Sequence, residues 1–162
     1  MTAAHARLGK ATERAVAAWW RTHGFPGAER IIRTGWRTRD RSAEDAGDLD
    51  LCPGVIAQVK SLQPPARAER AVPEWMAETE RQRVVAGAAI GLLIVRRPGT
   101  ADVGEWFAWL PARTAAALVD LSWPTAVADA PNPPLRLTVA DASLLLRWAG
   151  YGTDWTEVTA DA

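Results

Sequence analysis

Apolar and polar residues alternate along residues 47–61, GDLDLCPGVIAQVKS, on both sides of a Pro-Gly pair. Alternation with a period of two predicts two β-strands that each bury one face, and the Pro-Gly pair predicts the turn of a hairpin. A loop of three residues, Cys52–Gly54, pairs Leu49 with Ala57 and Asp50 with Ile56. It places the odd-numbered apolar side chains on one face, namely Leu49, Leu51, Val55, Ala57 and Val59. The other face then carries four polar residues, Asp48, Asp50, Gln58 and Lys60.

A helical period of apolar positions marks residues 4–23. Trp20 falls on the apolar side of this predicted helix, whereas Lys10 and Arg14 lie in a basic arc on the other side. Glu13 stands at the edge of the apolar stripe, where it is either a simple boundary charge or part of a site. The sequence HGFPG that follows predicts the end of the helix.

Strands and helices alternate along the rest of the chain. Residues 30–33 predict a short strand, and Pro73 opens a helix that runs through Ala86 and is closed by Gly87. Further strands are expected at residues 89–97, 105–111 and 135–139, and helices at residues 112–121 and 142–150. This order predicts an α/β fold with a mixed central β-sheet flanked by helices. We expect residues 1–125 to form the core domain, and residues 126–162 to be a C-terminal extension packed on or appended to it.

Charge is balanced overall but unevenly distributed. The 162 residues include 19 basic and 19 acidic ones, yet residues 1–41 hold nine basic residues against three acidic ones. Such an excess is typical of a nucleic-acid surface at this end of the chain. A single cysteine excludes an intramolecular disulfide, and the longest apolar run is too short to span a bilayer. A soluble, cytoplasmic protein without membrane association is therefore expected.

The polar face of the hairpin carries the residue types that phosphodiester hydrolysis needs. Hydrolysis requires a metal ion to neutralise charge and a water held in line with the phosphate. Mg²⁺ prefers oxygen ligands and needs only one or two carboxylates from the protein. Asp48 opposite Gln58 supplies oxygen ligands, and the ammonium of Lys60 could orient the attacking water. The alternative is a solvent-facing strand with ordinary charges, because short patterns of this kind are common by chance.

These motifs resemble the PD-(D/E)xK nuclease superfamily. The spacing of Asp48 from Gln58-Val59-Lys60 is similar to its metal-binding aspartate and catalytic lysine motif. The segments GKATERAVAAWWRTHGF, EWMAETERQRVVAGAAIGLLIVRR and GEWFAWLP resemble blocks of phage and actinobacterial Holliday-junction-resolvase-like endonucleases. The resemblance covers about residues 8–115 and implies a restriction-endonuclease-like α-β-β-β-α-β core. It also implies a Mg²⁺- or Mn²⁺-dependent DNA endonuclease, cytoplasmic in the host if phage-encoded, with a role in DNA recombination or repair.

The same resemblance implies roles for individual residues. Asp48 would bind the metal, Gln58 would take the place of the second acidic ligand, and the backbone carbonyl of Val59 would be a further ligand. Lys60 would be the catalytic lysine, and Glu13 matches the glutamate of the first helix that completes the site. Gln58 departs from the usual pattern because an amide oxygen brings no negative charge, although Mrr-type restriction nucleases resemble this chain there.

The expected partner is DNA, in branched or four-way form, bound by a homodimer. The phosphate contacts are expected from basic residues of the first helix and of the arginine-rich loop, with one tryptophan as a base contact. These residues are Lys10, Arg14, Arg33, Trp36, Arg37, Arg39 and Arg41. Two alternatives remain open at this point. One is a Mrr-like restriction or repair nuclease that acts on linear duplex, and the other is an inactive DNA-binding module, because Gln58 replaces the acidic ligand.

Three other acidic residues have no clear role from the sequence. Asp50 is either a second metal ligand or an aspartate that flanks the turn. Glu78 and Glu80, on the helix after the hairpin, are expected to belong to a solvated face.

Overall fold

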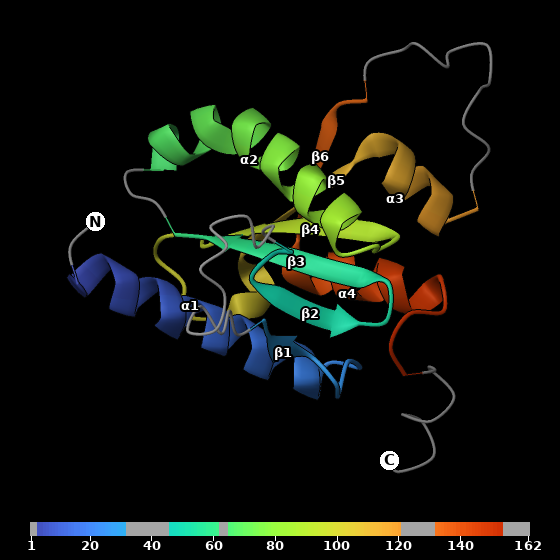
Figure 1. Ribbon diagram of the computed structural model, residues 1–162, viewed down its shortest axis with the longest axis horizontal. Coiled ribbons are helices and arrows are strands. Elements are labelled where there is room, and N and C mark those ends of the chain that lie inside the picture. The colour runs from blue at the N-terminus through green and yellow to red at the C-terminus, as the bar shows by residue number, and fades with distance from the viewer. Residues whose placement is uncertain (1–2, 32–45, 62–64, 121–131, 154–162) are drawn as a thin grey trace, which may run out of the picture.

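The computed structural model describes residues 3–31, 46–61, 65–120 and 132–153 of the chain. It is a mixed α/β structure, as the sequence predicted, with one six-stranded sheet and helices on both of its faces (Figure 1). The strands are neighbours in sequence order, β1 to β6. Only β3 and β4 pair in parallel, and the other neighbouring pairs are antiparallel. The elements, in chain order, are α1 (Ala3–Thr22), β1 (Glu29–Arg30), β2 (Leu49–Cys52), β3 (Val55–Lys60), α2 (Pro65–Val85), β4 (Ile90–Val95), a 3-10 turn η1 (Val103–Glu105), β5 (Phe107–Pro111), α3 (Ala112–Leu118), β6 (Pro134–Thr138) and α4 (Val139–Trp148).

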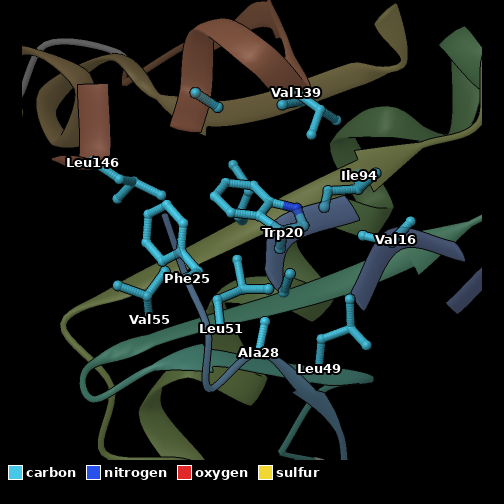
Figure 2. Packing of buried hydrophobic residues seen from close by; sticks show 14 of the residues in the cluster. Val16, Trp20, Phe25, Ala28, Leu49, Leu51, Val55, Ile94, Val139 and Leu146 are labelled. Carbon is cyan, nitrogen blue, oxygen red and sulfur yellow. The ribbon is translucent and has the colours of Figure 1, made fainter. Parts of the chain in front are cut away.

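The main core lies between one face of the sheet and the helices α1 and α4. Trp20 of α1 and Leu146 of α4 are fully buried there, together with Leu49 and Leu51 of β2 (Figure 2). The predicted apolar stripe of the first helix is what packs against the sheet, since Val16 is fully buried as well. A smaller core lies on the opposite face under α2 and includes the side chains Ala68, Val72, Leu93 and Val95.

The predicted hairpin forms, with one correction at its turn. Leu49 pairs with Ala57 and Asp50 with Ile56, as the alternation predicted, but Cys52 pairs with Val55 instead of belonging to the loop. The loop is therefore the two residues Pro53 and Gly54, and the extra residue is absorbed by a register shift between Asp50 and Cys52. The physical reason is the turn chemistry, because proline followed by a glycine with φ of 86° suits a tight two-residue turn.

The predicted start of the second long helix was wrong. Pro73 does not open the helix; it lies inside α2, which begins two turns earlier at Pro65. A proline inside a helix removes one backbone hydrogen bond, and helices tolerate this where packing compensates. Ala68 and Val72, on the turns before Pro73, bury their side chains against Leu93 and Val95, and this packing extends the helix.

The C-terminal segment shares the sheet and the main core. β6 pairs with β5 along its whole length, from Thr138 opposite Phe107 to Pro134 opposite Pro111. α4 follows at once, and Thr138 caps it, since its side chain accepts a hydrogen bond from the backbone N–H of Asp141. Among the described residues, no helix is both long and apolar enough to cross a membrane.

Candidate functional site

Asp48 is held between two strands at the point where β2 begins. Its backbone N–H donates to the carbonyl of Ala57 on β3 at 3.0 Å, and its own carbonyl accepts from the N–H of Ile31, just after β1, at 2.9 Å. The backbone of Asp48 is therefore fixed on both sides by the sheet, which positions the side chain at the sheet's end.

Gly47 allows this approach to the sheet. Its φ is 103°, a conformation that side-chain-bearing residues rarely adopt. A Cβ atom at this position would lie 3.2 Å from Cδ1 of Ile56 and 3.4 Å from the carbonyl oxygen of Ala57. The backbone angle therefore favours glycine directly before Asp48, and a larger residue would also require the end of the Ile56 side chain to shift.

The carboxylate of Asp48 reaches the backbone of Val59. Its Oδ2 accepts a hydrogen bond from the N–H of Val59 at 2.8 Å, at the place where β2 no longer supplies a backbone acceptor to β3. The N–H and C=O of one residue in a strand point to the same side of the strand. The carbonyl of Val59 consequently faces the side of β3 on which the Asp48 carboxylate lies.

A cavity of about 380 Å³ opens at this point, and we call it the Asp48 cavity. It is lined by Lys10, Glu13, Arg14, Arg30, Ile31, Gly47 and Asp48. The fold thus brings together four residues that the sequence proposed for a site from two separate segments, namely Lys10, Glu13, Arg14 and Asp48. Three cations and two carboxylates line one cavity, which suits an anionic ligand beside a carboxylate.

Glu13 has a partner that sequence reasoning missed. Its Oε2 accepts from Nε of Arg30 at 2.7 Å and lies 2.5 Å from Nη2 of the same guanidinium. The two side chains are 18% and 23% exposed, so this ion pair is partly buried. The positive charge of Arg30 balances the carboxylate of Glu13 and holds it at the wall of the cavity. No periodic pattern joins a residue of α1 to one of β1, so the pair could not be predicted from the sequence.

Gln58 lies on the opposite face of β3, against α2. It is 2% exposed, and its Oε1 accepts a hydrogen bond from the hydroxyl of Thr79 at 3.0 Å. Gly91 on the neighbouring strand lets α2 come this close, since a Cβ there would lie 3.2 Å from the carbonyl oxygen of Thr79. The sequence placed Gln58 beside Asp48 as a metal ligand, but it does not line the Asp48 cavity.

Lys60 also contacts α2. Its Nζ lies 2.9 Å from Oε2 of Glu78, and the two side chains are 24% and 34% exposed. Glu78, which was expected on a solvated face, is thus the partner of the proposed catalytic lysine. Glu80 is exposed and pairs with Arg83 on the same helix. In this arrangement Lys60 does not line the Asp48 cavity either.

Asp50 lies away from the Asp48 cavity. It lines a different cavity of about 480 Å³ near the hairpin turn, together with Cys52 and Pro53. Burial raises the pKa of the Asp50 carboxyl, and the nearby charge of Glu29 raises this pKa further. Burial likewise raises the pKa of the Cys52 thiol. This position matches the expectation of an aspartate that flanks the turn.

The donor set at the Asp48 cavity fits Mg²⁺ or Mn²⁺ in a minimal form. Within the described ranges, no group of three or more His, Cys, Asp or Glu side chains could hold a metal ion. Mg²⁺ needs only one or two carboxylates when waters complete its shell. The carboxylate of Asp48 and the carbonyl of Val59 are oxygen donors on one side of β3, whereas the amide oxygen of Gln58 is engaged by Thr79 on the other face.

The predicted DNA contacts divide into two groups. Lys10 and Arg14 are exposed on α1 and line the Asp48 cavity. The other five, Arg33, Trp36, Arg37, Arg39 and Arg41, lie outside the described residues. The described residues Ile31 and Gly47 both line the cavity.

Comparison with known proteins gives no relative. No family model matches the chain, and no significant match is found among curated proteins or among solved structures.

Proposed function

We propose that this protein is a metal-dependent endonuclease that hydrolyses phosphodiesters of DNA, with branched or four-way DNA as its substrate. The observation that carries the proposal is the Asp48 cavity. Its lining includes Asp48, whose carboxylate accepts a hydrogen bond from the backbone of Val59, and two exposed cations of α1, Lys10 and Arg14. The chain order α1-β1-β2-β3-α2-β4 is the one that the resemblance to the PD-(D/E)xK superfamily implies, and it supports the same proposal.

The residues at the cavity would have separate roles in binding the metal and the DNA. Asp48 and the carbonyl of Val59 would hold Mg²⁺ or Mn²⁺, which when bound supplies charge neutralisation at the phosphate and an activated water. Lys10 and Arg14 bind the phosphates on either side of the scissile one. Arg30 keeps the carboxylate of Glu13 at the cavity wall. There the carboxylate would accept a hydrogen bond from a water that binds the metal.

Lys60 has a conditional role in this proposal. It lies one residue beyond Val59 on β3, and its ammonium is held by Glu78 in the protein without DNA. Binding of a phosphate next to Val59 offers Lys60 a second anion. The ammonium of lysine is a compact charge on a flexible side chain, so Lys60 can exchange Glu78 for a phosphate. An arginine would make this exchange less readily, because its planar guanidinium binds its partner in a fixed geometry. Lys60 then orients the attacking water.

A homodimer follows from the proposed substrate. Resolution of a four-way junction requires two symmetric cuts, and two copies related by a two-fold axis place two equal sites on the junction.

A second candidate function, a DNA-binding module without cleavage, is favoured by one specific observation. The two side chains expected beside Asp48 are both engaged by α2, Gln58 through Thr79 and Lys60 through Glu78. If DNA binding leaves these contacts intact, the cavity binds a phosphate but does not hydrolyse it.

Cleavage of matched four-way and linear duplexes in Mg²⁺ or Mn²⁺ tests the proposal. We expect Asp48→Ala to lower the cleavage rate at least about 100-fold, because it removes the proposed carboxylate ligand. Asp48→Asn keeps an oxygen that can accept from the N–H of Val59, so it separates lost chemistry from lost structure and is expected to be equally inactive.

Each other outcome selects a different function. Equal cleavage of both substrates would replace the resolvase by a restriction or repair nuclease for linear duplex. Binding without cleavage, unchanged by Lys60→Ala, would support the DNA-binding module. Cleavage that persists in Asp48→Asn would overturn the proposed site.

A further inference from the structure

Two arginines lie over the aromatic rings of β5. The guanidinium carbon of Arg97 is 5.7 Å from the ring centroid of Phe107, and that of Arg136 is 5.0 Å from the same centroid. Arg136 also lies 5.8 Å from the ring centroid of Trp109. The two cations come from different parts of the chain, Arg97 from the segment that follows β4 and Arg136 from β6, and both contact the ring of Phe107.

This arginine pair lies at the same end of the sheet as Asp48. The register runs from Lys60 on β3 to Val95 on β4 and from Val95 to Phe107 on β5. Asp48 directly precedes β2 and is bonded to the end of β3. Adjacent strands lie about 4.8 Å apart, so three strand spacings place the backbone of Phe107, which carries the arginine pair, about 15 Å from that of Asp48. Figure 1 shows α1 and α2 both beginning at this end, on opposite faces of the sheet.

The rings under the arginines are held in place by packing. Phe107 and Trp109 are half-buried and pack against the smaller core under α2. A guanidinium that stacks on a fixed ring keeps its plane, and its N–H edges remain available to an acceptor in solvent. These edges match the geometry of a phosphate.

The charges around the pair leave a place for an anion. Arg97 is exposed, and the side chain of Arg136 is 49% exposed. Arg136 has Glu69 as an ion-pair partner at 3.4 Å, but the Glu69 side chain is 64% exposed, so solvent screens this contact. Both guanidinium groups are positively charged, so each attracts an anionic phosphate.

We infer that Arg97 and Arg136, positioned by Phe107 and Trp109, form a second contact for the phosphate backbone of the nucleic acid that binds at the Asp48 cavity. The inference rests on the proposed function, because it takes DNA as the ligand of that cavity. A separation of about 15 Å corresponds to about four to five base steps along one strand. The DNA therefore lies across the ends of β2 to β5.

Binding of a labelled duplex of about 20 base pairs to the full chain, without divalent metal and over a range of salt concentrations, tests this contact. The test variant is Arg97→Gln with Arg136→Gln, since glutamine keeps most of the aliphatic stem and removes the charge. Loss of two phosphate contacts should reduce the slope of log affinity against log salt by about 2 and weaken binding at low salt by about tenfold or more.

Single substitutions provide matched controls. Arg81 is exposed on α2, and Arg81→Gln removes one charge, as Arg136→Gln does. We expect Arg136→Gln to reduce the salt slope by about 1 and Arg81→Gln to leave it unchanged. Arg136→Lys keeps the charge without the planar stacking, so its affinity should lie between those of the wild type and Arg136→Gln. Circular dichroism and Tm establish that each variant is folded, and Arg136→Lys replaces the double variant if that one unfolds.

The outcomes separate this inference from the proposed function. A folded double variant with the salt slope and affinity of the wild type would overturn the inference even if the wild type cleaves DNA. A wild type that binds but never cleaves, with a reduced slope in the double variant, would overturn the nuclease and retain the contact. A wild type that binds no DNA would overturn both.

Discussion

The two faces of β3 are both covered by helices, but they differ in chemistry. On the side of α1, Val55 and Ala57 are fully buried in the main core, and Val59 packs against it. On the side of α2, Gln58 is almost as deeply buried, yet it is polar and hydrogen-bonded, and Lys60 next along that face is ion-paired. β3 thus packs apolar side chains against the main core on one face. On its other face, Gln58 and Lys60 make polar contacts with α2.

This difference shows that polar residues in a strand pattern need not mark a solvent-facing surface. A buried amide without a partner costs free energy, whereas a buried amide with a hydrogen bond is tolerated. Thr79 supplies that bond from a residue 21 positions later in the chain. The polar face of the hairpin is therefore partly an interface with α2, and the Asp48 cavity begins only at the end of the strands.

The largest effect is expected on the apolar face. Leu49→Ala removes a side chain that is fully buried in the main core, and we expect it to lower the free energy of unfolding by about 2–5 kcal/mol. Urea unfolding measures this change. Leu135→Ala is the matched control, because Leu135 of β6 is 42% exposed and should cost much less. Equal losses in the two variants would contradict the burial difference on which the comparison rests.

A smaller loss is expected on the polar face. Thr79→Val removes the hydroxyl and leaves the buried Oε1 of Gln58 without this donor, so the free energy of unfolding should fall by about 1–3 kcal/mol. Thr79→Ser retains the hydroxyl and serves as the control. In a double-mutant cycle with Gln58→Leu, the valine substitution should cost less, because the unpaired acceptor is gone. Additive losses in that cycle would show that the two side chains do not stabilise each other.

The smallest effect is expected at Asp50, beside the turn. Because its pKa is raised in the folded protein, the folded state holds the proton more tightly than the unfolded state does. Stability is thus lost as the pH rises from the ordinary pKa of 3.8 through the folded value, and the loss persists at neutral pH. Asp50→Asn should raise Tm slightly at neutral pH and leave it unchanged at pH values below 3.8.

Glu29→Gln provides the control for this pH dependence. Glu29 is the second cause of the shift after burial, so its neutralisation should recover a smaller part of the Tm difference. Salt should reduce that part, because the two carboxylates interact near the surface. A Tm gain in Asp50→Asn that is the same at acidic and neutral pH would contradict the raised pKa.

Much of the fold could be predicted because its signals are local. The alternation in residues 47–61 predicted the pairs Leu49 with Ala57 and Asp50 with Ile56, and both are confirmed. Residues 89–97 predicted a strand, and β4 forms at Ile90–Val95 with every residue buried. The predictions that failed, the loop at Cys52 and the helix start at Pro73, depended on a bulge and on packing of α2 against β4.

The candidate site was predictable only in part. Lys10 and Arg14 could be placed near each other because they share the basic arc of the predicted first helix, and Asp48 could be singled out by its motif. Glu13 was expected at the edge of the apolar stripe of that helix. That all four line one cavity depends on how α1 crosses the end of the sheet. The ion pairs of Glu13 with Arg30 and of Lys60 with Glu78 could not be predicted from the sequence. Nothing in the sequence distinguished Arg30 and Glu78 from the other arginines and glutamates.

By itself, the sequence determined which face of each helix and strand is apolar, because side-chain direction follows from the period of the backbone. It also determined the order of the strands along the hairpin. Only the tertiary structure decided what each polar residue faces. The spacing of Asp48, Gln58 and Lys60 in the sequence is compatible with two arrangements. The three side chains could form one site, or Gln58 and Lys60 could contact one helix while Asp48 lies on the other side of the strand. The packing of α2 turns Gln58 and Lys60 towards Thr79 and Glu78, while Asp48 reaches the backbone of Val59 beside α1.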